Sequence, residues 1–222
     1  MWIAGIALSC YLTALLTSFD KSKLEATRVL ELGAGLGLPS CLCRELGVGT
    51  VHATDYWEGD LNFGGPVDKE RLIPHMLFGE NLEFNVVQSA GVVSGDKAEK
   101  RSNVSVDKLD WYSEADVYRA KECADPSLIV ASDVVYYAED APPLARALET
   151  LLDDSGDTKT KREILLFLSL YNERKGLQEF REMITSRPGW NSSEEKIKLC
   201  MMNDELDSFK EEYSILLVKI SN

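Results

Sequence analysis

Short apolar runs alternate with helical patterns along this chain, and that alternation constrains the fold more than any other feature. Helical patterns lie at 39–46, about 71–87, 142–152 and 173–184. Strands that alternate with helices predict an α/β fold with a mostly parallel sheet. The first strands are continuous apolar runs, so we expect helices on both faces of that sheet. Apolar runs predict seven strands, at 29–32, 51–57, 104–111, 128–132, 164–170, 196–202 and 213–220.

Nothing in the sequence divides the chain into two domains. A length of 222 residues suits one domain, and no long linker interrupts it. We therefore expect a single domain over 1–222. Two polar, glycine-containing segments, 58–70 and 89–103, predict surface loop insertions within it.

The N-terminal segment carries no charge in its first nineteen residues, which raises the question of a signal peptide or a membrane anchor. It lacks the basic region that opens a signal peptide. Ser9, Thr13 and Thr17 recur every four residues, which draws one polar stripe along a helix. We therefore expect a helix over 1–20 that lies on the core with this stripe towards water, and no membrane partner.

The charge balance narrows the choice of partners. Lys plus Arg number 24 against 37 Asp plus Glu, a net charge of −13, and such a surface repels a phosphate backbone. We expect a protein or a cationic small molecule as partner and no nucleic acid, although acidity also serves solubility alone. The five cysteines form no CxxC pair and there are two histidines. This pattern predicts no disulfide framework and no metal site, and it favours a reducing, intracellular setting.

The strongest motif is VLELGAGLGLPS, in which Gly33, Gly35 and Gly37 alternate after a strand and Pro39 opens a helix. Glycines at such a turn let the backbone approach a ligand closely and adopt positive φ. The pattern is GxGxG, whereas dinucleotide-binding folds have GxGxxG. Glu31 precedes the first glycine by two residues, and a carboxylate there suits a cofactor that bears an ammonium group. We therefore favour S-adenosylmethionine as cofactor, with a nicotinamide dinucleotide as the alternative.

Two further strand ends support a nucleoside ligand. Asp55 ends the second strand, 22 residues after Gly33, which is the spacing of a carboxylate that binds ribose hydroxyls. Asp110 and Trp111 end the third strand at the same edge of the sheet. An aromatic ring there could cover one face of adenine, while plain core packing of Trp111 is the competing interpretation.

Several motifs together resemble a known family. WIAGIAL, LELGAGLGL, LDW and SDVVYY follow one another in the order seen in class I, seven-strand S-adenosylmethionine-dependent methyltransferases. The combination is more narrowly similar to methyltransferase family 16, the lysine methyltransferase-like group, and the asparagines Asn81 and Asn85 also match it. The resemblance implies a Rossmann-like seven-stranded sheet with an antiparallel last strand. It also implies that Glu31 helps to position the methionine end of the cofactor. The cofactor contacts that it implies are Trp2, Gly33, Ala34, Gly35, Asp55, Trp111 and Ser132.

The fourth strand ends in SDVVYY, which places Asp133 and Tyr136 three positions apart at the sheet edge. A lysine ammonium must lose a proton before it can attack a methyl group. Asp133 can orient that amine, and Tyr136 can accept a hydrogen bond or wall the channel, so we predict both as catalytic residues. Enzymes that methylate planar bases resemble [DNS]-P-P-[YFW] at this point. Val134 and Val135 stand here in place of both prolines, which argues against a nucleic-acid base as substrate.

We interpret the chain as an S-adenosylmethionine-dependent protein N-methyltransferase that acts on lysine, and the resemblance points to translation factors or chaperones as targets. One alternative keeps the chemistry with a small-molecule amine or a histidine as acceptor. Another is a cofactor-binding scaffold without activity, against which Glu31, Asp55 and Asp133 argue together. We expect a monomer located in the cytoplasm or the nucleus.

Overall fold

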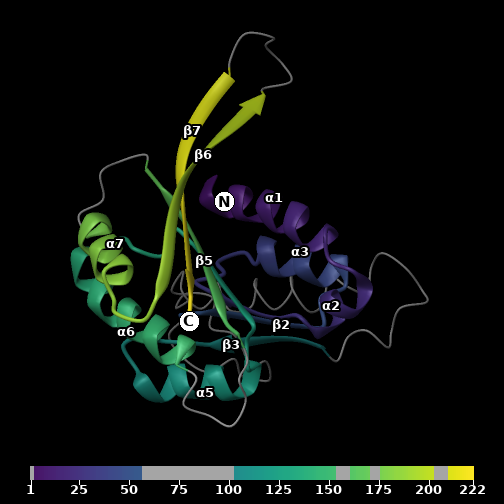
Figure 1. Cartoon of the computed structure of the whole chain (residues 1–222), viewed down its shortest axis with the longest axis horizontal. Helices are drawn as coiled ribbons and strands as arrows, with labels where there is room; N and C mark the ends of the chain where they lie inside the picture. Colours follow the sequence, from purple (N-terminus) through teal and green to yellow (C-terminus); the bar gives the residue numbers. More distant parts are fainter. Residues whose placement is uncertain (1–2, 57–102, 154–160, 171–175, 203–209) are drawn as a thin grey trace, which may run out of the picture.

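The computed structural model describes residues 3–56, 103–153, 161–170, 176–202 and 210–222. These residues form a seven-stranded sheet with helices on both sides (Figure 1). The strands are β1 (Arg28–Leu32), β2 (Thr50–Asp55), β3 (Val104–Lys108), β4 (Leu128–Ser132), β5 (Glu163–Ser169), β6 (Asn191–Met202) and β7 (Lys210–Ser221). The helices are α1 (Ile3–Thr17), α2 (Lys21–Ala26), α3 (Leu38–Leu46), α5 (Glu114–Ala124), α6 (Ala141–Leu152), α7 (Leu177–Thr185) and the short 3-10 helix η3 (Ala138–Asp140).

The sheet has the strand order β3-β2-β1-β4-β5-β7-β6. Strands β1 to β5 run parallel, and β7 pairs antiparallel with both β5 and β6. The predicted Rossmann-like sheet with an antiparallel last strand is therefore confirmed. The order reverses between β1 and β4, and the crevice at the carboxyl ends of strands beside such a reversal is where open α/β sheets bind ligands.

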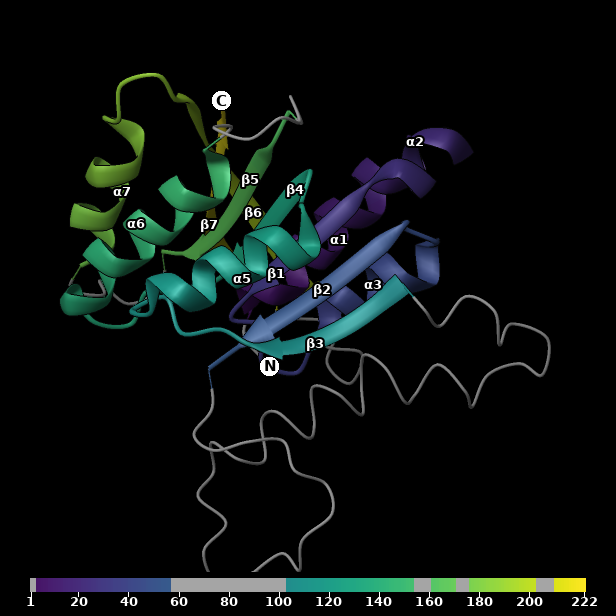
Figure 2. The same cartoon turned by 90° about the horizontal axis from the view of Figure 1, so that it is seen from below.

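Two hydrophobic layers hold the helices to the sheet. Helices α1 and α3 cover one face, and α5, α6 and α7 cover the other (Figure 2). In α6 the fully buried Leu144, Leu148 and Leu151 recur at helical spacing and point to the sheet. Burial of each such side chain contributes about 1.5–3 kcal/mol, which holds α6 against its face of the sheet.

Helix α1 corrects one detail of the sequence analysis. Thr13 and Thr17 are exposed as predicted, but Ser9 is buried, so the polar stripe does not face water along its whole length. Each hydroxyl group donates a hydrogen bond to the main-chain carbonyl four residues earlier. That bond satisfies the Ser9 hydroxyl without solvent. No helix within the described residues is long and apolar enough to cross a membrane.

Several predicted boundaries also change. The polar segment after α1 forms the short helix α2, whose N-cap Asp20 accepts a hydrogen bond from the Lys23 amide. Helix α5 was not predicted, β3 ends at Lys108 rather than at Trp111, and β6 begins at Asn191. The predicted helix at 71–87, the insertion 58–70 and nearly all of the insertion 89–103 lie outside the described residues. A single domain over the whole chain stays a prediction.

Candidate active site

A cavity of about 360 Å³ opens at the carboxyl-terminal edge of the sheet, beside the reversal between β1 and β4. Its walls come from the glycine loop after β1, the end of β2, the loop after β3, the turn after β4 and one residue of α1. The lining residues are Gly5, Gly33, Ala34, Gly35, Leu36, Leu38, Pro39, Asp55, Tyr56, Trp111, Ser132, Asp133, Val134 and Tyr136. Most of the predicted site residues therefore meet in one place.

The glycine loop needs glycine at its first position for two separate reasons. Gly33 has φ +62°, in the left-handed region, and a Cβ atom added there would lie 2.7 Å from Cγ1 of Val134. Gly35 also has positive φ, but a Cβ atom there would meet nothing within 4 Å. The loop is held by hydrogen bonds from the Ala34 amide to the Thr54 carbonyl and from the Gly37 amide to the Ala34 carbonyl. Gly33 thus permits close packing against Val134 in the turn after β4, whereas Gly35 supplies only a backbone conformation.

Asp55 ties the end of β2 to this loop. Its Oδ2 accepts a hydrogen bond from the Gly35 amide at 2.6 Å, and its Oδ1 accepts one from the Tyr56 amide at 2.7 Å. Burial raises the pKa of the Asp55 carboxyl group, and the two main-chain bonds oppose that shift. The carboxylate lines the cavity in a fixed orientation, where it can face hydroxyl groups of a ligand.

Glu31 has a different place from the one its sequence position suggests. Its side chain is 1% exposed and is not among the cavity-lining residues. Oε2 accepts hydrogen bonds from the Ser40 amide at 3.0 Å and from the Ser40 hydroxyl. Burial raises the pKa of Glu31 to about 8, while the Ser40 bonds lower it and the nearby Asp55 raises it. Glu31 therefore fastens the first turn of α3 to β1, beneath the glycine loop.

The turn after β4 brings Asp133 and Tyr136 to the same cavity. Asp133 has φ +52°, an unusual conformation for a residue with a side chain. Its carboxylate is buried, and Oδ1 accepts a hydrogen bond from the Ser169 amide at 2.7 Å. Val134 and Val135 are buried in the core, so the chain reaches the surface again at Tyr136, which is 42% exposed and lines the cavity. Two buried valines thus space the carboxylate and the phenol.

Three other predicted residues lie at the cavity as well. Ala34 and Ser132 line it, and Trp111 lines it while also packing against the core, so both interpretations of Trp111 describe part of its environment. Trp2 lies outside the described residues, as do Asn81 and Asn85.

Sequence reasoning missed a contribution from α1. Gly5 lines the cavity, and a Cβ atom added to it would lie 3.4 Å from Oγ of Ser132. Tyr56, Leu36 and Leu38 were missed too. The sequence signal for Tyr56 was its place beside Asp55, and that for Leu36 and Leu38 was their place in or next to the glycine loop. Gly5 had no such signal, because contact between α1 and β4 depends on the tertiary fold.

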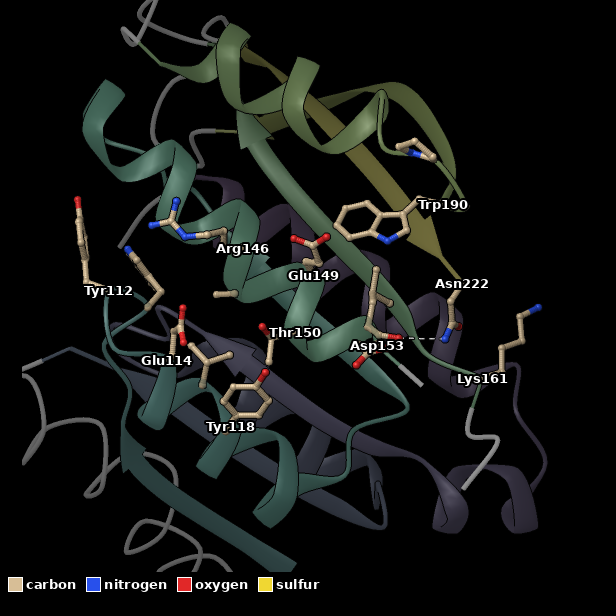
Figure 3. Close-up of a pocket in the computed structure, with 16 residues that line it drawn as sticks. Tyr112, Glu114, Tyr118, Arg146, Glu149, Thr150, Asp153, Lys161, Trp190 and Asn222 are labelled. Atoms are coloured by element: carbon tan, nitrogen blue, oxygen red, sulfur yellow. Dashed lines mark hydrogen bonds between the residues drawn. The ribbon is translucent and has the colours of Figure 1, made fainter. Parts of the chain in front are cut away.

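A second hollow, a groove of about 890 Å³, lies on the outer face of α6 between α5 and the turn before β6 (Figure 3). Tyr112 lies at one end and Asn222 at the other, with Arg146, Glu149 and Thr150 between them. Trp111 lines both the groove and the cavity. The groove was not predicted, and it adjoins the cavity at the loop after β3.

Comparison with known proteins identifies a family that matches this chain. The family described as lysine methyltransferase matches residues 1–62 and 80–187. The chain is 28% identical over 157 residues to the protein N-terminal and lysine N-methyltransferase EFM7 of Yarrowia lipolytica, covering 70% of this chain and 53% of that protein. It is 27% identical over 158 residues to the protein N-lysine methyltransferase METTL21A of Danio rerio, covering 71% and 56%. The match thus spans about half the length of these curated relatives.

Solved structures agree on the fold. A SAM-dependent methyltransferase from Anabaena variabilis superposes with a TM-score of 0.61 at 10% identity, over 97% of this chain and 84% of that one. Magnesium protoporphyrin IX methyltransferase from Synechocystis, a structure with bound SAH, gives 0.57 at 12% identity, over 97% and 82%. At such identities the likeness shows the fold alone. With the family match over most of its residues, the chain belongs to the lysine methyltransferase family named above.

Proposed function

We propose that this protein is an S-adenosylmethionine-dependent protein N-methyltransferase that acts on lysine side chains. One observation carries the proposal. A single cavity at the switch point of the sheet is lined by the glycine loop, by the Asp55 carboxylate and by the Asp133–Tyr136 turn. A cofactor-binding half and an acceptor-binding half therefore share one space, as a direct transfer between two bound molecules requires.

The cofactor-binding half fits a nucleoside that carries an amino acid. Asp55 presents a fixed carboxylate to ribose hydroxyls, and Trp111 offers a ring to adenine. The glycine loop lines the same cavity, where its main chain can approach the methionine end of the cofactor closely. Glu31 acts there through Ser40 and α3 rather than by direct contact. Trp2 stays a predicted contact.

The acceptor-binding half is Asp133 with Tyr136. When bound, the cofactor supplies a sulfonium-linked methyl group with a good leaving group. Asp133, held by the Ser169 amide, orients the incoming amine, and Tyr136 walls the cavity beside it. Transfer of that methyl group to the neutral amine nitrogen would break the carbon–sulfur bond and leave its electron pair on sulfur. The proton lost from the ammonium group goes to water before attack, so Asp133 is a positioning group before it is a base.

A protein lysine fits the described surface better than the alternatives. Val134 and Val135 are buried where a base-binding site needs prolines to shape a flat slot. The net charge of −13 favours a basic partner over nucleic acid. The names of the relatives point to protein amines, both lysine and N-terminal. A translation factor or chaperone as target, a cytoplasmic or nuclear location and a monomeric state belong to the same proposal.

Cofactor binding is tested first, by calorimetry with S-adenosylhomocysteine. We expect Asp55→Ala to weaken binding about 10- to 100-fold, because hydrogen bonds to a charged group are lost. Glu122→Ala, which removes an exposed carboxylate from α5, serves as the matched control and should bind as the wild type does. Absence of binding by the wild-type protein refutes the proposal.

Methyl transfer is tested with tritiated cofactor and a lysate from cells that lack the enzyme. We expect label in one protein band, carried by lysine on mass spectrometry, and a much lower rate for Asp133→Asn with cofactor affinity retained. Label on an α-amino group or a histidine would change the acceptor class. Label in the small-molecule fraction alone contradicts a protein substrate, and binding without any transfer supports the scaffold interpretation.

A further inference from the structure

The loop after β3 and the turn after β4 are joined by one side chain outside the cavity. Asp140, the last residue of η3, accepts a hydrogen bond at Oδ1 from the Tyr112 hydroxyl at 2.9 Å. Its Oδ2 accepts one from the Tyr137 amide at 3.2 Å. The Tyr112 hydroxyl also reaches the Glu139 carbonyl at 3.2 Å. One carboxylate therefore links two segments that lie 25 or more residues apart in sequence.

Each of these partners stands next to a wall of the cavity. Tyr112 follows Trp111 directly, and Tyr137 follows Tyr136 directly, while Trp111 and Tyr136 line the cavity. Strands β3 and β4 are not neighbours, because β2 and β1 lie between them in the sheet. The Asp140 bridge thus joins the two ends across the sheet edge without passing through the cavity.

The Asp140 end of the bridge, in η3, is held firmly by α7. Gly176 opens α7 with φ +99°, and a Cβ atom there would lie 2.5 Å from the Cα atom of Ala138. Helix α7 therefore presses on η3, which limits the positions open to Asp140. The Tyr112 end of the bridge is more open, since Tyr112 is 56% exposed at the end of the groove (Figure 3). Tyr112 is therefore the more exposed end of the bridge, and the bridge connects the loop that carries Trp111 to the main chain next to Tyr136.

We propose that Asp140 and Tyr112 are positioning residues that couple the cofactor wall at Trp111 to the acceptor wall at Tyr136. The inference rests on the proposed function, since it assigns the two walls to cofactor and acceptor. Cofactor that settles against Trp111 fixes the Tyr112 hydroxyl, and Asp140 then holds the main chain of Tyr137 and with it the Tyr136 ring. Without the bridge the cofactor still binds, but the acceptor wall no longer responds to it.

A spectroscopic test follows the bridge itself. Protein labelled with 3-fluorotyrosine is titrated with S-adenosylhomocysteine, and the Tyr137 resonance is assigned with Tyr137→Phe. Tyr137 is 65% exposed and does not line the cavity, so a change in its signal reports the relay rather than contact with the ligand. We expect the signal to respond in the wild type and in Tyr118→Phe, and not in Tyr112→Phe. Tyr118→Phe is the matched control because it removes an exposed groove hydroxyl outside the bridge.

Kinetics separate positioning from structural support. We expect Tyr112→Phe and Asp140→Asn each to lower kcat about 3- to 10-fold on the acceptor protein found in the labelling experiment. Affinity for S-adenosylhomocysteine should stay within about twofold, and the double variant should be no slower than either single one. The inference is overturned if Tyr112→Phe keeps both the Tyr137 response and the kcat of the wild type. It is also overturned if the losses in kcat of the two single variants add in the double variant. A wild type that binds no cofactor refutes the proposed function instead.

Discussion

Glu31 offers the sharpest test of how the site is built, because burial raises the pKa of its carboxyl group from the usual 4.5 to about 8. The side chain is 1% exposed and meets the Ser40 amide and hydroxyl. At neutral pH the folded protein therefore holds a proton on Glu31 that the unfolded chain releases. Ionisation of this one group opposes folding.

The sign and size follow from proton linkage. Where the folded state binds more protons than the unfolded state, the free energy of unfolding falls as pH rises. The contribution of Glu31 to the free energy of unfolding is fully present below pH 4.5, declines as the pH rises to about 8 and is constant above that pH. One pKa unit corresponds to about 1.4 kcal/mol, so between pH 6 and pH 8 this group lowers the free energy of unfolding by about 2 kcal/mol. Glu31→Gln cannot ionise, and its amide oxygen can still accept both hydrogen bonds from Ser40.

Urea unfolding at pH 6, 7 and 8 measures the effect. We expect the free energy of unfolding of Glu31→Gln to exceed that of the wild type by a margin that grows by about 2 kcal/mol across this range. Glu122→Gln replaces an exposed glutamate on α5 and should follow the wild type. Parallel pH profiles for the wild type and Glu31→Gln would refute the reasoning, since Glu31 would then ionise as easily in the folded protein as in the unfolded chain.

Two other substitutions test the packing around the strand ends. Gly33→Ala should lower the free energy of unfolding by about 2–4 kcal/mol in urea, because the added Cβ atom meets Val134 and φ is positive. Gly35→Ala has only the backbone penalty, about 1 kcal/mol, and equal losses would contradict the geometry. Arg162→Met should cost about 1–3 kcal/mol in the same assay, because this buried guanidinium donates to main-chain oxygens and the Pro126 carbonyl would lose its bond to it. Arg119→Met, at an exposed ion pair, should cost less than about 1 kcal/mol, and similar costs for both would be inconsistent with burial as the cause.

Local signals in the sequence were sufficient for much of the fold and for most of the cavity. The glycine loop and Asp55 are adjacent to strand ends, and parallel strands bring their carboxyl ends to one edge. Once β1, β2 and β4 are identified, the meeting of Gly33, Asp55 and Asp133 follows from topology alone. Those residues line one cavity in the structure, whereas their individual roles stay predictions.

The features that the sequence did not predict depend on weak local patterns or on contacts between segments far apart in the chain. Helix α5 buries only Val117, Ala120 and Ala124, and so narrow a stripe gives little periodic signal. Its start was nevertheless marked by Ser113, which caps the helix. The Glu31 position could not be predicted, because the sequence does not show that α3 turns its first amides back towards β1. The bridge at Asp140 likewise exists only in three dimensions.

Glu31, Asp55 and Asp133 are held in the same way, since each side chain accepts a hydrogen bond from a main-chain amide. Glu31 meets the amide of Ser40, Asp55 that of Gly35, and Asp133 that of Ser169. No Lys, Arg or His is among the described residues that line the cavity.

Asp55 and Asp133 line the cavity, and because the backbone fixes their side chains they need no cation to orient them. Glu31 lies outside the cavity lining and is neutral at neutral pH, so any negative potential in the cavity comes from Asp55 and Asp133. In the proposed function that potential attracts both a sulfonium and a lysine ammonium, but it also raises the pKa of the bound lysine and so opposes the proton loss that attack requires. The positive charge of the cofactor offsets this effect only while it is bound next to the acceptor. The geometry therefore favours deprotonation of lysine after the cofactor is in place, which is the order that a coupled pair of walls at Trp111 and Tyr136 would enforce.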